Sequence, residues 1–385
     1  MLNNPSIAPR VLVIVGTRPE GIKLAPVVDA LRVCGAAVDA RVALTGQHTS
    51  LIDQVLDVFD LRASWDLGIM KEGQDLYDVA YGCLDGLRRV VQEFRPSMLL
   101  VQGDTASVFF GALVGFFERV RVGHVEAGLR TGDKWRPYPE ELLRRMTGVV
   151  ADSHFAPTAR ARSNLLNESI DPAAIHVTGN TVVDAVLRMA AVPHEPVNAA
   201  LRDVLDSGRR LVLVTAHRRE SFGKPLREVF AALRDIADAF DDVTLLYPVH
   251  PNPNVRAPAE EVLGGHARIR LTEPLDYMDL LHGLRHAVLA ITDSGGIQEE
   301  APSFGTHVLV LREVTERPEA VEAGVARLVG TDRALIVSAA AQILRGASRA
   351  HGANPYGDGR AGERIADIIV HDLTGVPRTT ADWQP

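Results

Sequence analysis

The chain has 385 residues, of which 46% are hydrophobic and 23% are charged, a composition that is typical of a globular protein and excludes disorder. At roughly 150 residues per domain, this length predicts two or three domains, with cores large enough to need no disulfide or structural metal. The 49 acidic residues outnumber the 41 basic ones and give a net charge of -8, which disfavours general nucleic-acid binding because that function needs a basic surface.

The cysteines and the hydropathy of the chain exclude further classes of protein. Cys34 and Cys83 are far apart and form no C-x-x-C pair, so a disulfide framework and a thiolate metal site are both disfavoured. Residues 1–10 lack the basic start and apolar stretch of a signal peptide, and the longest apolar run, Ala106–Phe117, is too short to cross a bilayer. We therefore expect a cytoplasmic, soluble protein that neither inserts into a membrane nor binds nucleic acid.

The first half of the chain alternates apolar strands with amphipathic helices. Each strand runs into a polar turn and then into a helical pattern, and the predicted strands cover residues 11–16, 40–44, 98–102 and 121–125. Nearly continuous apolar strands of this kind indicate a parallel sheet with helices on both faces.

The same pattern restarts after a proline-rich break at residues 192–196. The predicted strands of this second part cover residues 210–215, 243–247, 287–292 and 307–311. We therefore predict an α/β fold of two Rossmann-like domains whose parallel sheets face a cleft, where ligands bind at the carboxyl ends of the strands. The predicted N-terminal domain spans residues 1–190, the predicted C-terminal domain spans 191–359, and a helix and tail at 360–385 pack back on the first domain.

Charged residues directly follow several of these strands. They are Arg18, Asp104, Glu126, His217, Asp293 and Arg312. Any one of them is best explained as an ordinary polar loop residue at the point where solvent begins. Six at the ligand edge of two sheets favour a binding or catalytic role instead.

The segment DSGGIQEE, residues 293–300, joins a strand to a helix. Ser294 at the helix start, with Gly295 and Gly296 behind it, would leave backbone N–H groups free for a phosphate. Arg317 and Arg18 could add charge-assisted hydrogen bonds to the same anion, and Glu300 could accept hydrogen bonds from a ribose. The alternative is an ordinary capped helix, since Ser-Gly-Gly is common.

Cofactor chemistry receives little support. The segment GTRPEGIK, residues 16–23, is not a G-x-G-x-x-G fingerprint, which disfavours a nicotinamide dehydrogenase. Arg18 and Lys23 in this segment suit an anionic ligand, although a solvated helix position explains Lys23 equally well. The histidines lack H-E-x-x-H spacing, so we expect neither a metal nor another cofactor. The residues alone thus predict a two-domain enzyme that acts on a nucleotide-linked substrate, with the nucleotide on the second domain and a carboxylate-lined pocket on the first.

Eight motifs, in order along the chain, together resemble the non-hydrolysing UDP-N-acetylglucosamine 2-epimerases. They are GTRPEGIK (16–23), GDT (103–105), HVEAGLR (124–130), PEE (139–141), GNT (179–181), HRRESFG (217–223), YPVH (247–250) and TDSGGIQEE (292–300). This resemblance implies a glycosyltransferase-B-type fold and a homodimer without metal or nicotinamide. It also implies interconversion of UDP-N-acetylglucosamine and UDP-N-acetylmannosamine for cell-surface polysaccharides, through elimination and re-addition of UDP.

The resemblance also implies residue roles. Asp104, Glu126 and Glu140 match the family's catalytic carboxylates, and His217 matches its catalytic histidine; which carboxylate is base and which is acid stays open. The residues that match the family's substrate- and UDP-binding positions are Arg18, Lys23, Arg144, Ser294, Gly295, Gly296, Glu300 and Arg317.

Some positions depart from the family pattern. Leu143 stands where relatives usually carry asparagine, Ser50 stands at a glutamine position and Gly73 at an arginine position. The last two belong to the site at which a second UDP-N-acetylglucosamine activates some relatives. Gln47, Arg218 and His250 have the residue types that these relatives have at the activator site, so such allosteric activation stays open.

The alternative functions are a hydrolysing 2-epimerase, a glycosyltransferase that uses the same donor and, more distantly, a non-catalytic binding protein.

Overall fold

The computed structural model describes residues 8–46, 59–69, 71, 73–346, 349 and 352–384. The chain divides into two compact units: unit 1 comprises Met1–Ala185 and Tyr356–Pro385, and unit 2 comprises Val186–Pro355. The boundary between them falls within helix α7 (Thr181–Ala190). Each unit contains a parallel sheet covered by helices, so the predicted fold of two Rossmann-like domains is confirmed.

The sheet of unit 1 has, among the described residues, seven parallel strands in the order β3-β2-β1-β4-β5-β6-β7. Their bounds are β1 (Arg10–Val15), β2 (Asp39–Leu44), β3 (Ala63–Asp66), β4 (Met98–Gln102), β5 (Arg121–Val125), β6 (Ser153–Ala156) and β7 (Ile175–Val177). Every residue of β4 is buried, as expected for a central strand with helices on both faces.

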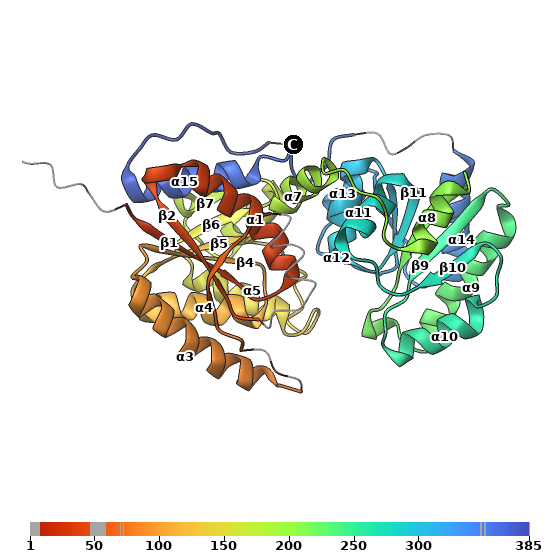
Figure 1. Ribbon diagram of the computed structural model, residues 1–385, viewed down its shortest axis with the longest axis horizontal. Helices are drawn as coiled ribbons and strands as arrows, with labels where there is room; N and C mark the ends of the chain where they lie inside the picture. Colours follow the sequence, from red (N-terminus) through yellow and green to blue (C-terminus); the bar gives the residue numbers. More distant parts are fainter. Residues whose placement is uncertain are drawn as a thin grey trace, which may run out of the picture. The chain divides into compact units, whose positions relative to one another are not determined.

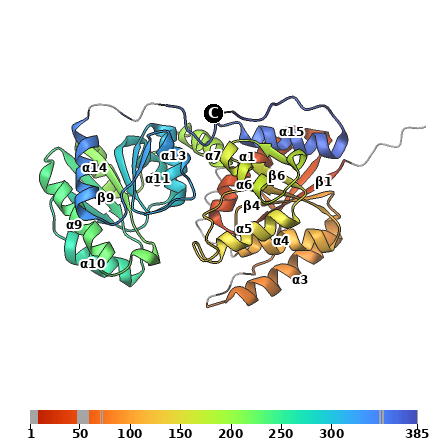
Figure 2. The same ribbon diagram turned by 180° about the vertical axis from the view of Figure 1, so that it is seen from behind.

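Helices cover both faces of this sheet (Figures 1 and 2). α1 (Arg18–Val33) packs against the C-terminal helix α15 (Ala361–Thr374) on one face. α3 (Leu76–Phe94), α4 (Ala106–Phe117) and α5 (Glu140–Val150) pack in succession on the other face, and α6 (Ala159–Asn167) connects β6 to β7. No helix among the described residues is both long enough and apolar enough to span a membrane.

The sheet of unit 2 has, in the part of the chain that the structure describes, six parallel strands in the order β10-β9-β8-β11-β12-β13. The strands are β8 (Arg210–Thr215), β9 (Val243–Pro248), β10 (Ile269–Thr272), β11 (Ala287–Thr292), β12 (His307–Val310) and β13 (Ala326–Leu328). The helices are α8 (Ala199–Asp206), α9 (Lys224–Ala239), α10 (Pro253–Leu263), α11 (Tyr277–His286), α12 (Gly295–Glu300), α13 (Glu319–Glu322) and α14 (Arg333–Arg345). The main core lies where α9, α10 and α14 cover the sheet.

Strand order reverses direction at one place in each sheet. In unit 1 the chain runs from β1 outward to β2 and β3, then returns to place β4 on the other side of β1; β8 and β11 have the same relation in unit 2. At such a switch point the loops that follow the two strands diverge and leave room for a ligand. The loops after β1 and β4, and after β8 and β11, are therefore the places where this fold positions a site.

Candidate active site

The loops after β1 and β4 in unit 1 are tied together by a buried glutamate. Glu20, in the first turn of α1, accepts a hydrogen bond from the Gly16 N–H at 2.7 Å and one from the Thr105 hydroxyl at 2.9 Å. A Cβ on Gly16 would lie 2.6 Å from the Cβ of Ser107, so only glycine allows this close approach of the β1 loop to α4. Glu20 thereby fixes the loop that carries Asp104.

Burial raises the pKa of Glu20 to about 7, although its hydrogen bonds from Gly16, Thr105 and Thr17 act in the opposite direction. On the neighbouring strand β5, His124 is also buried, and its Nε2 lies 2.8 Å from the carbonyl oxygen of Gly103. Burial, with a smaller contribution from Arg144, lowers the pKa of His124 to about 3, so this histidine is neutral and supports the loop rather than acting as a cation.

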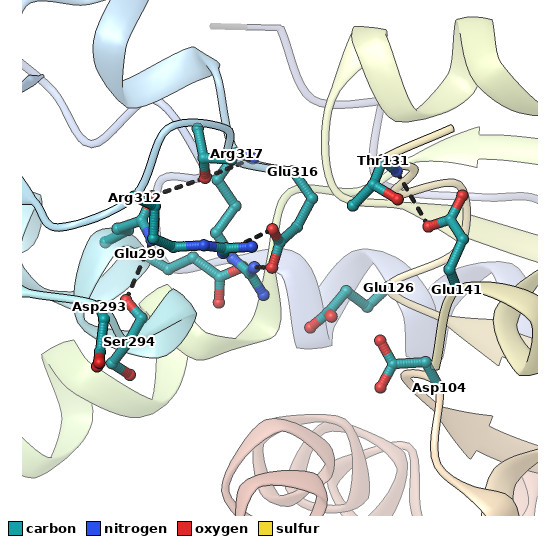
Figure 3. Close-up of polar contacts among 12 residues, drawn as sticks. Asp104, Glu126, Thr131, Glu141, Asp293, Ser294, Glu299, Arg312, Glu316 and Arg317 are labelled. Carbon is teal, nitrogen blue, oxygen red and sulfur yellow. Dashed lines mark hydrogen bonds and ion pairs between the residues drawn. The ribbon is translucent and has the colours of Figure 1, made fainter. Parts of the chain in front are cut away.

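Asp104 follows β4, Glu126 follows β5, and their carboxylates lie near one another and extend in the same direction (Figure 3). Arg144 of α5 bridges them: its Nη2 lies 2.5 Å from Asp104 Oδ2 and 3.1 Å from Glu126 Oε1. Its Nη1 also donates to the main-chain oxygen of Glu126. One buried guanidinium therefore holds the ends of two strands and both carboxylates in one cluster.

The carboxylates of Glu126 and Asp104 differ in how many contacts hold them and in how exposed they are. The Glu126 side chain is 3% exposed, pairs with Lys23 and accepts a hydrogen bond from Gln102 at 2.9 Å. Its backbone has φ of 62°, a left-handed conformation that is uncommon for a residue other than glycine. The Asp104 side chain is 29% exposed. Glu126 is therefore held on both oxygens, whereas Asp104 is open to a ligand.

The first turn of α5 carries the remaining acidic residues of unit 1. Glu140 is partly buried and lies four residues before Arg144, which places both on one face of the helix. Glu141 accepts hydrogen bonds from the N–H groups of Thr131 and Gly132, at 3.0 and 3.1 Å, and so anchors the loop before α5 (Figure 3). The Leu143 side chain is buried in α5.

Positive charge from α1 reaches the same strand ends. Lys23 is engaged by Glu126, as described above. Arg18 is partly exposed and makes no side-chain hydrogen bond or ion pair with the residues that the structure describes. Of these two predicted anion-binding residues, Arg18 is thus the one whose charge is open to an incoming ligand.

In unit 2, His217 and Asp293 follow the adjacent strands β8 and β11. Asp293 is 1% exposed, and its Oδ2 accepts hydrogen bonds from the N–H groups of His217 and Arg218, at 2.6 and 2.8 Å. The His217 ring stacks on His250 with centroids 5.5 Å apart. Burial, together with the neighbouring His217, lowers the pKa of His250.

Ser294 precedes α12 as its N-cap, but its side chain makes no capping hydrogen bond. A Cβ on Gly295 would lie 2.5 Å from Nη1 of Arg317, so the guanidinium occupies the space that glycine leaves open, whereas Gly296 has more room. Glu300, 7% exposed, accepts a hydrogen bond from the Tyr277 hydroxyl at 3.0 Å.

Arg317 belongs to an ion-pair network within unit 2 (Figure 3). Its Nε donates to Glu299 Oε1 at 2.6 Å, and its Nη1 pairs with Glu316. Arg312 also donates to Glu316, at 2.8 Å. Burial alone would raise the pKa of Glu316, but Arg317 and Arg312 outweigh it and lower this pKa to about 2. The carboxylate is thus ionised at neutral pH, and its charge faces the predicted phosphate-binding arginine.

The structure describes only some of the residues that match the activator site of relatives. Gln47 and Ser50 lie outside the described residues. Gly73 has a positive φ of 75° and lines a surface cavity beside α3 in unit 1. Arg218 donates through Nε to the main-chain oxygen of Asp293 at 2.9 Å.

One group within the described residues has ligand atoms close enough for a metal ion: His194, Asp276 and Asp279 in unit 2. Asp279 is buried and accepts hydrogen bonds from the N–H groups of Val197 and Asn198, with His194 Nε2 at 2.6 Å. These contacts fix the segment before α8 against α11. A structural role therefore accounts for the three side chains without a metal ion.

Four residues of the site were not assigned a role from the sequence, and two of them, Gln102 and Glu20, have a feature that could have indicated one. Gln102 is the polar end of the otherwise apolar strand MLLVQ, and Glu20 is followed by a run of mostly apolar residues, 21–28, that are all buried in α1. Glu299 and Glu316 gave no such signal, because their role depends on an arginine that approaches from another loop.

Two doubly wound sheets, each with charged residues at its switch point, define this protein as an α/β enzyme of the Rossmann-like class. The family model of UDP-N-acetylglucosamine 2-epimerase matches residues 34–370. A Ralstonia solanacearum protein named "Probable UDP-N-acetylglucosamine 2-epimerase" is 48% identical over 371 residues, which cover 94% of this chain and 98% of that protein.

Solved structures agree with this match. The Staphylococcus aureus MnaA–UDP co-structure has a TM-score of 0.89 and 42% identity, covering 98% of this chain and 100% of that one. The UDP-GlcNAc 2-epimerase of Neisseria meningitidis bound to UDP-GlcNAc has a TM-score of 0.87 and 37% identity, covering 94% of this chain and 99% of that one. The chain belongs to the UDP-N-acetylglucosamine 2-epimerase family.

Proposed function

We propose that this protein reversibly converts UDP-N-acetylglucosamine into UDP-N-acetylmannosamine by releasing UDP and adding it back. The observation that carries the proposal is the cluster at the ends of β4 and β5, where Asp104 and Glu126 meet at Arg144. Membership of the family and the UDP-N-acetylglucosamine bound to the N. meningitidis relative support this substrate.

The chemistry explains why several carboxylates are needed. The C2–H bond of the sugar has no neighbouring ring carbonyl, so direct removal of its proton is very costly. When UDP leaves first, positive charge develops at C1, acidifies C2–H and leads to a glycal intermediate. A proton then returns to the opposite face of C2 and UDP adds back. The site must therefore supply a base and an acid on different faces, and negative charge near C1.

The geometry of unit 1 supports a division of these roles. Asp104 has the more exposed carboxylate, so we assign it a proton transfer at C2. Glu126 is held by Lys23, Gln102 and Arg144, and a fixed carboxylate suits electrostatic stabilisation of the charge at C1 better than it suits proton transfer. Glu140, on the face of α5 that bears Arg144, takes the second proton transfer.

The loops of unit 2 hold the nucleotide in this proposal. Ser294, Gly295, Gly296 and Arg317 contact the diphosphate, Glu300 contacts the ribose, and His217 contacts the departing phosphate oxygen. The uncapped Ser294 side chain and the glycine beside Arg317 support the diphosphate assignment. Arg18 and Lys23 of unit 1 add positive charge for the phosphates.

We also propose that the enzyme works as a homodimer in the cytoplasm, where it meets its nucleotide-sugar substrate. Exposed apolar side chains on the contacting helices α4 and α5 support a subunit interface, since Phe116, Phe117 and Val149 are 62%, 63% and 81% exposed. Light scattering on the purified protein should give twice the chain mass; a monomeric mass would contradict the dimer.

Isotope exchange tests the reaction. Incubation with UDP-N-acetylglucosamine in deuterated water should place deuterium at C2 of both epimers, because the C2 proton is lost to solvent and regained. Retention of the C2 hydrogen after prolonged incubation would refute the proposal. Free N-acetylmannosamine as the sole product would indicate the hydrolysing alternative, and sugar transfer only when an acceptor is added would indicate a glycosyltransferase.

A further inference from the structure

The buried carboxylate of Asp293 is fixed against the histidine that follows the neighbouring strand. β11 and β8 pair in parallel with Thr292 opposite Thr215, so the residues that follow these strands, Asp293 and His217, lie close together. Asp293 Oδ2 accepts the N–H groups of His217 and Arg218, and its own N–H donates to the Thr215 carbonyl at 3.1 Å. Asp293 has little freedom to move, and it holds the backbone of His217 in turn.

The second oxygen of Asp293 faces the imidazole ring. Oδ1 is buried without a hydrogen bond among the described residues, and the ring nitrogen Nδ1 of His217 lies 3.2 Å from it. The ring is stacked on His250 with an angle of only 6° between the planes. A ring nitrogen that faces a carboxylate oxygen carries the hydrogen, because two acceptors would repel each other. The proton that His217 can exchange is then the one on Nε2.

We propose that Asp293 is a positioning residue that holds His217 with its hydrogen on Nδ1, so that Nε2 serves the departing UDP. This inference rests on the proposed function, in which His217 contacts the leaving phosphate oxygen. When the C1–O bond breaks, its electron pair goes to that oxygen, which accepts a hydrogen bond from Nε2–H of the protonated ring. Asp293 meanwhile accepts Nδ1–H and stabilises the positive charge of the ring. The same contacts operate in reverse when UDP adds back.

Asp293→Asn tests this role with little change in shape. The amide oxygen can still accept the two main-chain N–H groups, but the NH₂ group then faces Nδ1 and favours the opposite tautomer. In a serine protease the corresponding change costs about 10⁴-fold in kcat, so we expect a fall of roughly 10²- to 10⁴-fold here. The Kd for UDP should change by less than about threefold, since an interaction that matters mainly during bond breaking affects kcat rather than binding.

A double-mutant cycle separates positioning from a general structural effect. If Asp293 acts through His217, adding Asp293→Asn to a His217→Asn variant should cost less than about twofold more. Asp279→Asn is the matched control, because Asp279 is also buried, accepts two main-chain N–H groups and contacts a histidine, His194. This control should keep the wild-type kcat.

Nitrogen-15 NMR of histidine-labelled wild-type protein reports the tautomer directly, and His217→Asn identifies the signal. A hydrogen on Nδ1 of His217 supports the proposal, and a neutral ring with its hydrogen on Nε2 overturns it, even where Asp293→Asn fails to fold. Wild-type kcat in Asp293→Asn, or the same loss in both backgrounds of the cycle, would also overturn it. Failure of the wild-type protein to epimerise would refute the proposed function instead, and the NMR measurement would still test the Asp293–His217 contact.

Discussion

Glu20 offers a quantitative test, because its protonation is linked to folding. Its side chain is enclosed between the loops after β1 and β4, and burial raises its pKa from 4.5 to about 7. In the unfolded chain this carboxyl ionises as the pH rises past 4.5, whereas in the folded protein it stays protonated until about pH 7. The folded state therefore binds more protons over this interval, and stability falls as the pH rises through it.

The size of this effect follows from the shift. One pKa unit corresponds to about 1.4 kcal/mol, so the full shift is worth roughly 3 kcal/mol, and about 2.5 kcal/mol of it falls between pH 5 and pH 8. Glu20→Gln cannot ionise and resembles the protonated acid in shape. The variant should therefore gain about 2.5 kcal/mol of unfolding free energy relative to the wild type when the pH is raised from 5 to 8.

Urea unfolding of both proteins at pH 5 and pH 8 measures this double difference, in which the titration of other groups largely cancels. Glu195→Gln removes an exposed carboxyl and serves as the control. A stability difference between Glu20→Gln and the wild type that is the same at both pH values would refute the link between burial of Glu20 and its raised pKa.

Three further substitutions test the site. Asp104→Asn removes the proposed proton-transfer group and should lower kcat by roughly 10²- to 10⁴-fold while UDP still binds; unchanged turnover would remove Asp104 from the mechanism. Arg144→Met leaves two carboxylates without their shared guanidinium and should destabilise the protein by roughly 3–5 kcal/mol in urea unfolding. Arg227→Met, at an exposed ion pair, should cost far less, and equal losses would contradict this expectation. Gly295→Ala forces the arginine beside it to move and should raise the calorimetric Kd for UDP roughly tenfold, whereas Gly283→Ala, which meets only ordinary contacts, should not.

The predicted strands were recognisable because they are short apolar runs between polar turns. β6 is buried at every residue but was not predicted, because its sequence, SHFA, is short and half polar. The predicted strands at 98–102 and 287–292 coincide with β4 and β11. β3 was not predicted, since it is an edge strand of four residues with exposed positions in alternation. The order of strands was not predictable either: β1 pairs with β4, far along the chain, and no local pattern encodes that pairing.

The residues of the site also fall into two groups, those that could be predicted from the sequence and those that could not. Asp104 and Glu126 were recognisable because each lies within two residues of the end of a strand, and parallel strands bring their carboxyl ends to one edge. The residue that joins them, Arg144, comes from a helix, and its partners depend on how that helix packs. A charged residue's position along a strand is thus a local property, whereas its partner is set by tertiary packing.

Arg317 shows why this distinction matters for function. In the sequence it is a cation available for a phosphate, but in the folded protein Glu299 and Glu316 already engage its guanidinium. If Arg317 contacts UDP as proposed, the diphosphate has to compete with, or share, these carboxylates. Because Glu316 is ionised at neutral pH, it repels any anion that does not gain compensating hydrogen bonds from the loop at Ser294. This cost is the same for simple phosphate and for UDP. Because the nucleoside makes contacts of its own, UDP can offset the cost, whereas simple phosphate has no such contacts.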